Sequence, residues 1–176
     1  MLQKFNEKNR DLVVNINGKL VHRDEAGVSP FDSAVQGGDA VWEGLRLYDG
    51  RIFALEEHLA RLRSSALALA FADIPSNEKI IAEIRRTLAA NGMKDGVHLR
   101  LTLTRGVKVT SGMDPRLNQS GPTLIVLAEH KAPVYSKGMA ASSRYSASAS
   151  RSISATTAAT SEGFVPKSGR RTVRTR

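Results

Sequence analysis

The apolar periodicity of this 176-residue chain stops near residue 138, and that break limits what can fold. Of the last 38 residues, 21 are Ser, Ala or Thr, and arginine is their main charged residue. A segment without regularly spaced apolar residues cannot bury enough surface to offset its loss of conformational entropy. The sequence therefore predicts one folded domain over residues 1–138, followed by a Ser/Ala/Arg-rich disordered tail over residues 139–176.

The composition excludes several classes of protein. The chain contains no cysteine, which rules out disulfide scaffolds, thiolate metal sites and cysteine nucleophiles. The longest apolar run, residues 66–72, is far shorter than the roughly 20 residues of a membrane-spanning helix. The N-terminal residues are broken by Lys4, Lys8 and Arg10 and do not resemble a signal peptide. We therefore expect a cytoplasmic protein without a membrane segment.

The net charge of +9 raises nucleic acid as a partner. Residues 139–176 hold seven basic residues and one acidic residue, a net +6, which leaves +3 for residues 1–138. A nucleic-acid binder that acts through this basic tail is therefore an alternative from another class of function. The tail has few aromatic residues and no recognition module, which disfavours this alternative.

Two turn dipeptides predict β-hairpins. Asn17-Gly18 separates strand-like residues 12–16 from 19–21, and Asp49-Gly50 separates residues 40–48 from 51–55. Both dipeptides adopt the positive φ angles of a tight hairpin turn with ease. Residues 27–32 break the strand pattern, so a loop is expected there.

The next segments predict two helices and two further strands. Apolar residues at steps of three and four predict an amphipathic helix over residues 55–69, and Ser76 is a suitable cap for a second helix that ends near Asn91. Period-two alternation predicts a strand over residues 97–104, and residues 123–128 form a short apolar strand. The predicted fold class is α+β, a mostly antiparallel sheet with two helices.

Three segments are more specific than the composition. The first is Gln36-Gly-Gly-Asp-Ala-Val-Trp-Glu-Gly-Leu-Arg46, the second is residues 48–62 with Ser65-Ala66, and the third is residues 98–106. Together they resemble the fold-type IV pyridoxal-phosphate enzymes, and most closely the branched-chain amino acid aminotransferases. The resemblance covers roughly residues 12–135. It implies the N-terminal domain of the type IV aminotransferase fold.

The resemblance implies roles for four residues. Arg61 stands where the family keeps its phosphate-binding arginine, and a guanidinium suits a dianionic phosphate because it donates two parallel hydrogen bonds. Trp42, Arg46 and Arg100 stand where relatives border the substrate. His58 lies one helical turn before Arg61, and we assign it no chemistry. No catalytic residue and no metal site is predicted.

Two positions depart from the branched-chain pattern. Gly37 and His98 stand where many branched-chain enzymes have tyrosine. These departures keep open two alternatives within the fold, a D-amino acid aminotransferase and an aminodeoxychorismate lyase. The segment from Glu43 to Arg46 favours the branched-chain enzymes over both.

The resemblance also implies pyridoxal 5'-phosphate as cofactor and transfer of an amino group between Leu, Ile or Val and 2-oxoglutarate, as in branched-chain amino acid biosynthesis. Full-length relatives are expected to work as homodimers. Their lysine that bonds to the cofactor lies in a Lys-x-x-Asn pattern, which none of the nine lysines here matches. We therefore expect a truncated form, inactive alone, and the abrupt tail suggests the hypothesis of an out-of-frame reading after residue 138.

Overall fold

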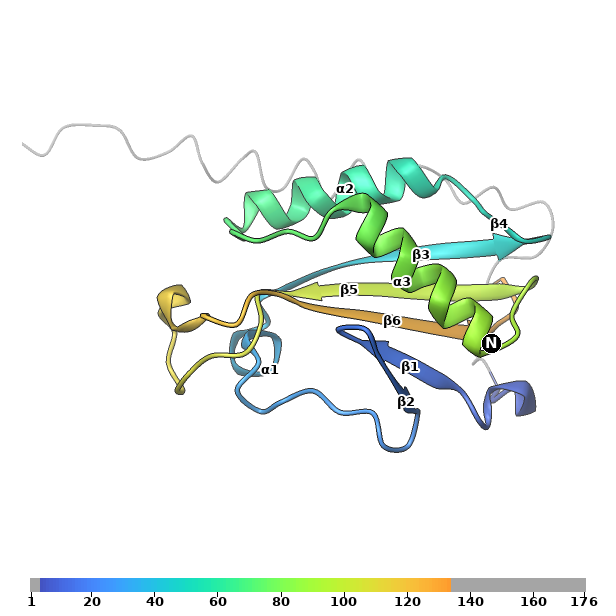
Figure 1. Ribbon diagram of the computed structural model, residues 1–176, viewed down its shortest axis with the longest axis horizontal. Helices are drawn as coiled ribbons and strands as arrows, with labels where there is room; N and C mark the ends of the chain where they lie inside the picture. Colours follow the sequence, from blue (N-terminus) through green and yellow to red (C-terminus); the bar gives the residue numbers. More distant parts are fainter. Residues whose placement is uncertain (1–3, 134–176) are drawn as a thin grey trace, which may run out of the picture. The chain divides into compact units, whose positions relative to one another are not determined.

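A computed structural model describes residues 4–133, which form a six-stranded sheet with three helices (Figure 1). The strand order is β2-β1-β6-β5-β3-β4, and every neighbouring pair is antiparallel. The strands are β1 (Val13–Ile16), β2 (Lys19–His22), β3 (Ala40–Tyr48), β4 (Arg51–Ile52), β5 (Val97–Thr104) and β6 (Thr123–His130). The helices are α1 (Ser33–Gly37), α2 (Leu55–Ala68) and α3 (Asn77–Ala90), with single 3-10 turns at Glu7–Asn9 and Pro115–Leu117.

The α+β class and the mostly antiparallel sheet are thus confirmed, whereas the count of two helices is wrong. The additional helix, α1, follows the predicted loop directly. Asp32 caps it by accepting a hydrogen bond from the backbone N–H of Ala34 at 2.9 Å, and Gly38 ends it with a φ of 70°. A helix of five residues is too short to produce an apolar period, so its capping residues were its only sequence signal.

Both predicted hairpin turns are confirmed. Asn17 and Gly18 have φ angles of 50° and 82°, and Asp49 and Gly50 have φ angles of 45° and 76°. Two consecutive positive φ angles give the turn a twist that matches the flanking strands.

The second hairpin is shorter than predicted. Its return strand, β4, ends at Ile52, whereas the sequence predicted a strand to residue 55. Ala54 takes a left-handed conformation, with a φ of 48°, and Leu55 already begins α2. The strand-like apolar residues at 53–55 are therefore divided between a turn and the start of the helix.

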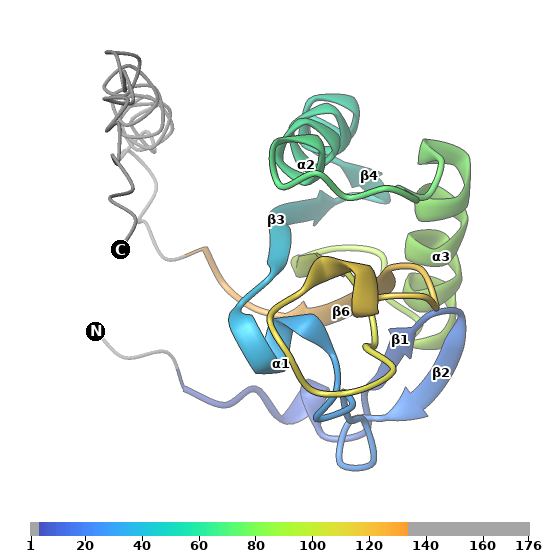
Figure 2. The same ribbon diagram turned by 90° about the vertical axis from the view of Figure 1, so that its left-hand side faces the viewer.

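The core lies between one face of the sheet and the helices α2 and α3 (Figure 2). Alternate residues of the central strands point to these helices, including the fully buried Leu45, Leu99 and Val126. Burying each such side chain contributes about 1.5 to 3 kcal/mol. Within residues 4–133 no helix covers the other face of the sheet, so the side chains of that face remain partly open to solvent.

The tail predicted over residues 139–176 lies outside the described residues. Among the residues that are described, no helix has the length and apolar character required to cross a lipid bilayer.

Substituting Gly106 tests the close approach that ends β5. A Cβ on Gly106 would lie 1.9 Å from the backbone oxygen of Gly121, and the φ of Gly106 is 110°. We expect Gly106→Ala to lower the free energy of unfolding by about 3 kcal/mol or more, because the backbone segments at Gly106 and Gly121 cannot move apart freely. Urea unfolding of the whole chain measures this.

Gly27→Ala is the matched control, since a Cβ there meets nothing within 4 Å. The control should change the free energy by less than about 0.5 kcal/mol. Equal stability of the two variants would contradict the packing at Gly106.

Candidate functional site

Strand β3 places an acidic side chain on one face of the sheet and an aromatic side chain on the other. Glu43 faces α2 and is buried, whereas its neighbour Trp42 faces the side without helices and is 55% exposed. Successive side chains of a strand point to opposite faces, so one strand supplies both groups. Residues 40–45 of β3 also have no strand beside them on the side away from β5, within the part of the chain that the structure describes.

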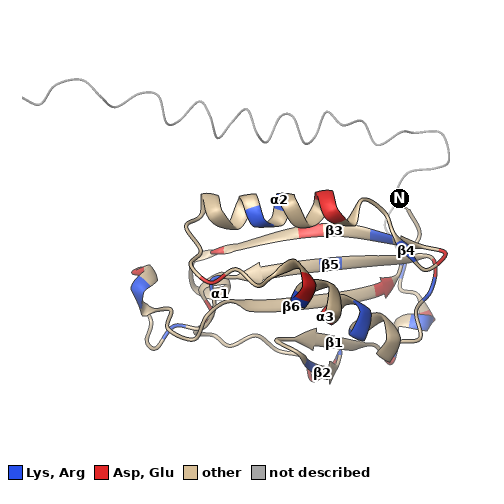
Figure 3. Cartoon of the chain, turned by 45° about the horizontal axis from the view of Figure 1, so that its top comes forward, with Lys and Arg blue, Asp and Glu red and all other residues tan. Residues whose placement is uncertain are grey.

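Arg61, the predicted phosphate ligand, points from α2 toward this strand. Its Nε donates to Glu43 Oε1 at 2.7 Å, and its Nη2 donates to Glu43 Oε2 at 2.6 Å. The Arg61 side chain is 52% exposed, while that of Glu43 is only 9% exposed. Figure 3 shows how α2 lies along β3, which brings these residues together from 18 positions apart.

The pair is electrostatically complementary. The hydrogen bond to Glu43 raises the pKa of Arg61 above its ordinary value, so the guanidinium stays charged. A buried carboxylate left without partners would cost on the order of 3 kcal/mol, which fixes the position of the guanidinium. One edge of Arg61 is therefore anchored by Glu43, and about half of the side chain remains exposed.

His58 joins this pair, a contact that sequence reasoning missed. Its Nδ1 lies 2.8 Å from Glu43 Oε2 and 2.8 Å from Arg61 Nη2. The spacing of three residues between His58 and Arg61 placed both on one helix face. No signal in the sequence showed that a carboxylate from β3 meets that face.

Trp42 and Arg100 form a stacked pair on the opposite face of the sheet. The guanidinium carbon of Arg100 lies 3.5 Å from the centre of the Trp42 ring. Gly44 is paired with Arg100 across the strands, and a Cβ there would lie 3.3 Å from His98 Nε2 and 3.9 Å from the Trp42 ring. The stack holds a cation over an aromatic surface, which suits a small anion attached to an apolar group.

Arg46 shares this face but is held by the backbone. Its Nη1 donates to the carbonyl oxygen of Lys131 at 2.7 Å, and its guanidinium lies over the Tyr48 ring at 5.4 Å. The structure therefore brings the three predicted substrate residues to one face. It places the predicted phosphate ligand, Arg61, on the other side of β3.

The two departures from the branched-chain pattern lie in different places. Gly37 ends α1, where a Cβ would meet Met113 at 3.6 Å. His98 lies between the arginines of the face without helices, and its Nδ1 is buried without a hydrogen-bond partner. Burial lowers the pKa of His98, and the charges of Lys131 and Arg46 lower it further.

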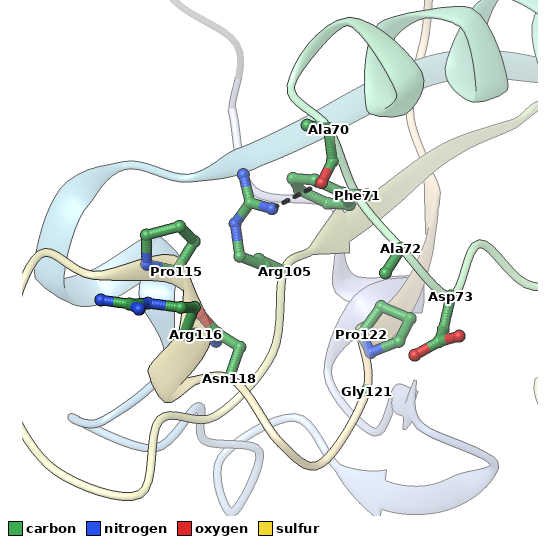
Figure 4. A pocket seen from close by; sticks show the side chains of 10 residues that line it. All are labelled: Ala70, Phe71, Ala72, Asp73, Arg105, Pro115, Arg116, Asn118, Gly121 and Pro122. Carbon is green, nitrogen blue, oxygen red and sulfur yellow. Dashed lines mark hydrogen bonds between the residues drawn. The ribbon is translucent and has the colours of Figure 1, made fainter.

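A separate cavity of about 310 Å³ opens beside the end of β5 (Figure 4). Its Arg105 donates to the carbonyl oxygens of Ala70, at 3.0 Å, and Leu69, at 2.6 Å, and also pairs with Asp39. Its second arginine, Arg116, pairs with Asp114 and lowers the pKa of that carboxyl to about 2. Both cations are thus occupied by the protein itself, and Arg105 joins the end of β5 to the end of α2.

Comparisons with known proteins agree with this architecture. Residues 40–159 match the family described as amino-transferase class IV. The chain is 59% identical over 128 residues to branched-chain-amino-acid aminotransferase-like protein 2 of Arabidopsis thaliana, which covers 73% of this chain and 23% of the plant protein. It is 42% identical over 116 residues to a putative branched-chain-amino-acid aminotransferase of Methanocaldococcus jannaschii, covering 65% and 39%. A D-alanine aminotransferase of Bacillus licheniformis is 35% identical over 63% of this chain and 37% of its own length.

Solved structures show the same fold. The branched-chain amino acid aminotransferase of Escherichia coli superposes with a TM-score of 0.62 at 23% identity, over 72% of this chain and 42% of that one. The branched-chain aminotransferase of the archaeon Thermoproteus uzoniensis, solved with norvaline, gives 0.55 at 22% identity, over 68% and 40%. The chain spans less than half the length of each of these relatives.

The environment of His98 predicts a pH dependence of stability. Because its pKa is lowered in the folded protein, the unfolded chain binds more protons below the ordinary value of 6.5. The groups around it are Lys131, Arg46 and Arg100, which lower the pKa, and Glu129, which raises it. Stability should therefore fall as the pH drops through 6.5 toward the folded pKa.

We expect His98→Asn to remove this contribution. Urea unfolding from about pH 7.5 to about pH 5.5 brackets the ordinary histidine pKa. The wild-type chain should lose more stability than His98→Asn over that interval. Equal losses would contradict the buried, cation-flanked environment.

Proposed function

Because this chain belongs to the class IV aminotransferases, we propose that it is the part of a branched-chain amino acid aminotransferase that holds the phosphate end of pyridoxal 5'-phosphate and borders the substrate. The single observation that carries the proposal is the anchored guanidinium of Arg61. Its inner edge is bound by the buried Glu43, its side chain is 52% exposed, and His58 Nδ1 lies 2.8 Å from Nη2. The relatives that carry the branched-chain name support the choice of reaction.

The residues present fit the phosphate end of the cofactor. An arginine held by a bidentate carboxylate keeps its direction and loses little entropy when it binds a second partner. Its solvent-facing Nη1 and Nη2 groups can donate two parallel hydrogen bonds to a dianionic phosphate. When bound, pyridoxal phosphate would carry the amino group between the two acids and serve as the electron sink for the reacting carbon.

The substrate side is proposed to be the face that bears Trp42 and Arg100. The stacked guanidinium would attract a carboxylate, while the exposed indole offers an apolar surface to a branched side chain. Arg46 is held by Lys131 and Tyr48 and would act by shaping this face. We expect no turnover by this chain alone, because none of its nine lysines lies in the family's Lys-x-x-Asn pattern.

A D-amino acid aminotransferase is the second candidate. Two observations favour it, the match to D-alanine aminotransferases and the presence of Gly37 and His98 in place of tyrosine. An unpartnered His98 Nδ1 on the substrate-side face would alter the contacts offered to the substrate.

Binding of pyridoxamine 5'-phosphate tests the role of Arg61. This form of the cofactor lacks an aldehyde, so it cannot react with surface lysines. Trp42 is the only tryptophan, and quenching of its fluorescence reports binding. We expect Arg61→Lys to weaken binding about tenfold or more, because lysine keeps the charge but loses the two-pronged hydrogen bond.

Arg85→Lys on the exposed side of α3 is the matched control and should leave binding unchanged. Pyridoxamine without phosphate should bind far more weakly than the phosphorylated form, and equally to both variants. Equal affinity for the two ligands, or an unaffected Arg61→Lys variant, would overturn the proposal.

A pair of 2-oxo acids separates the two candidate reactions. With pyridoxamine 5'-phosphate present, a branched-chain site should bind 4-methyl-2-oxopentanoate more tightly than pyruvate by about tenfold or more, because three additional carbons become buried. Trp42→Ala should abolish the preference, measured by isothermal calorimetry. Tighter binding of pyruvate would favour the D-amino acid reaction.

A further inference from the structure

The cluster around Arg61 contains one group that can change its hydrogen-bonding role. Arg61 Nη2 can only donate, and Glu43 Oε2, as a carboxylate oxygen, can only accept. His58 Nδ1 lies 2.8 Å from each of them, and the two are themselves 2.6 Å apart. The neutral imidazole can therefore bond to only one of its two neighbours through Nδ1 at a time.

The two tautomers of His58 satisfy different partners. With the hydrogen on Nε2, the Nδ1 lone pair accepts from Arg61 Nη2, which also donates to Glu43 Oε2. With the hydrogen on Nδ1, the ring donates to Glu43 Oε2 and accepts nothing from Arg61. The second arrangement releases one N–H of Nη2.

That released N–H belongs to the outer edge of the guanidinium. The Nε and Nη2 donors of Arg61 on the inner edge are bound to Glu43. The outer edge consists of Nη1 and the second N–H of Nη2, and only this edge is free for a bidentate contact with an anion. A ligand that took the Nη2 hydrogen without a change at His58 would leave two lone pairs 2.8 Å apart, on Nδ1 and on Glu43 Oε2.

We propose that His58 is a positioning residue that exchanges Arg61 for Glu43 as its hydrogen-bond partner when Arg61 binds a phosphate group. This proposal rests on the proposed function, which supplies the phosphate. In the exchange Nε2 gives its hydrogen to water and Nδ1 takes one from water, so the ring stays neutral and the protons balance. The His58 side chain is 17% exposed, which gives water access to the ring. Glu43 remains fully bonded in both arrangements.

The exchange is directly observable in the ring nitrogens of His58. We would record the nitrogen resonances of the histidine rings in the 15N-labelled chain and assign His58 from their loss in His58→Asn. Addition of pyridoxamine 5'-phosphate should convert Nδ1 from the bare to the hydrogen-bearing form, and Nε2 in the reverse sense. Pyridoxamine without phosphate should cause no conversion.

Two substitutions separate positioning from packing. His58→Leu should change the affinity for pyridoxamine 5'-phosphate by less than about twofold, because the exchange gives His58 one hydrogen bond in both the free and the bound state. His58→Asn should behave in the same way, because its amide near the Nδ1 position can accept from Arg61 or donate to Glu43. A His58 that stayed an acceptor would oppose the phosphate, and His58→Leu would then bind about fivefold or more tightly than the wild type. Circular dichroism confirms that each variant is folded, and His22→Asn on β2 is the control for histidine loss.

The outcomes distinguish this inference from the proposed function. If Arg61-dependent binding occurs while His58 keeps one tautomer, or if His58→Leu binds about fivefold or more tightly than the wild type, the exchange is wrong and the phosphate role of Arg61 stands. A His58 ring that is doubly protonated in either state also overturns it. If neither Arg61→Lys nor the phosphate affects binding, the proposed function itself fails.

Discussion

A buried carboxylate on the outermost long strand determines how the first long helix sits on the sheet. Glu43 faces the helix layer, where Arg61 compensates its charge and His58 Nδ1 lies within hydrogen-bonding distance. Removing a charge from water is costly unless its hydrogen bonds are replaced. Helix α2 must therefore pack on β3 in the position that brings Arg61 and His58 to Glu43. The same contacts leave one edge of Arg61 outside the core. The same interaction thus satisfies Glu43 and fixes the direction of the Arg61 guanidinium.

Because successive residues of β3 point to opposite faces of the sheet, Glu43 and Trp42 lie in different surroundings. The residues of β3 that face α2 and α3 include the core side chains and Glu43, which binds Arg61. The alternate residues, among them Trp42, lie on the other face together with Arg46 and Arg100. The cavity beside the end of β5 offers less to an anion, because Arg105 and Arg116 are already paired with Asp39 and Asp114.

The elements that the sequence predicted well share a strong local signal. Strand β5 was predicted with its observed bounds, since eight alternating residues fix the period, and α3 was bounded by Ser76 and Asn91. The signal failed where elements are short. Helix α1 has five residues, and the apolar run after Gly50 was assigned to one strand although Ala54 turns the chain. For the candidate site, the resemblance assigned roles to Arg61, Trp42, Arg46 and Arg100, which stay predictions, and it gave His58 no role.

By itself, the sequence determined the long strands and helices, which face of each is apolar, and which family the chain resembles, because these depend on spacing between neighbouring residues. Only the tertiary structure decided that Glu43 meets Arg61 and His58, that Arg100 lies on Trp42, and that these two groups occupy opposite faces of β3. Contacts between residues distant in the chain depend on the position of each helix on the sheet and on the register of the strands. Both are determined by the packing of the whole core.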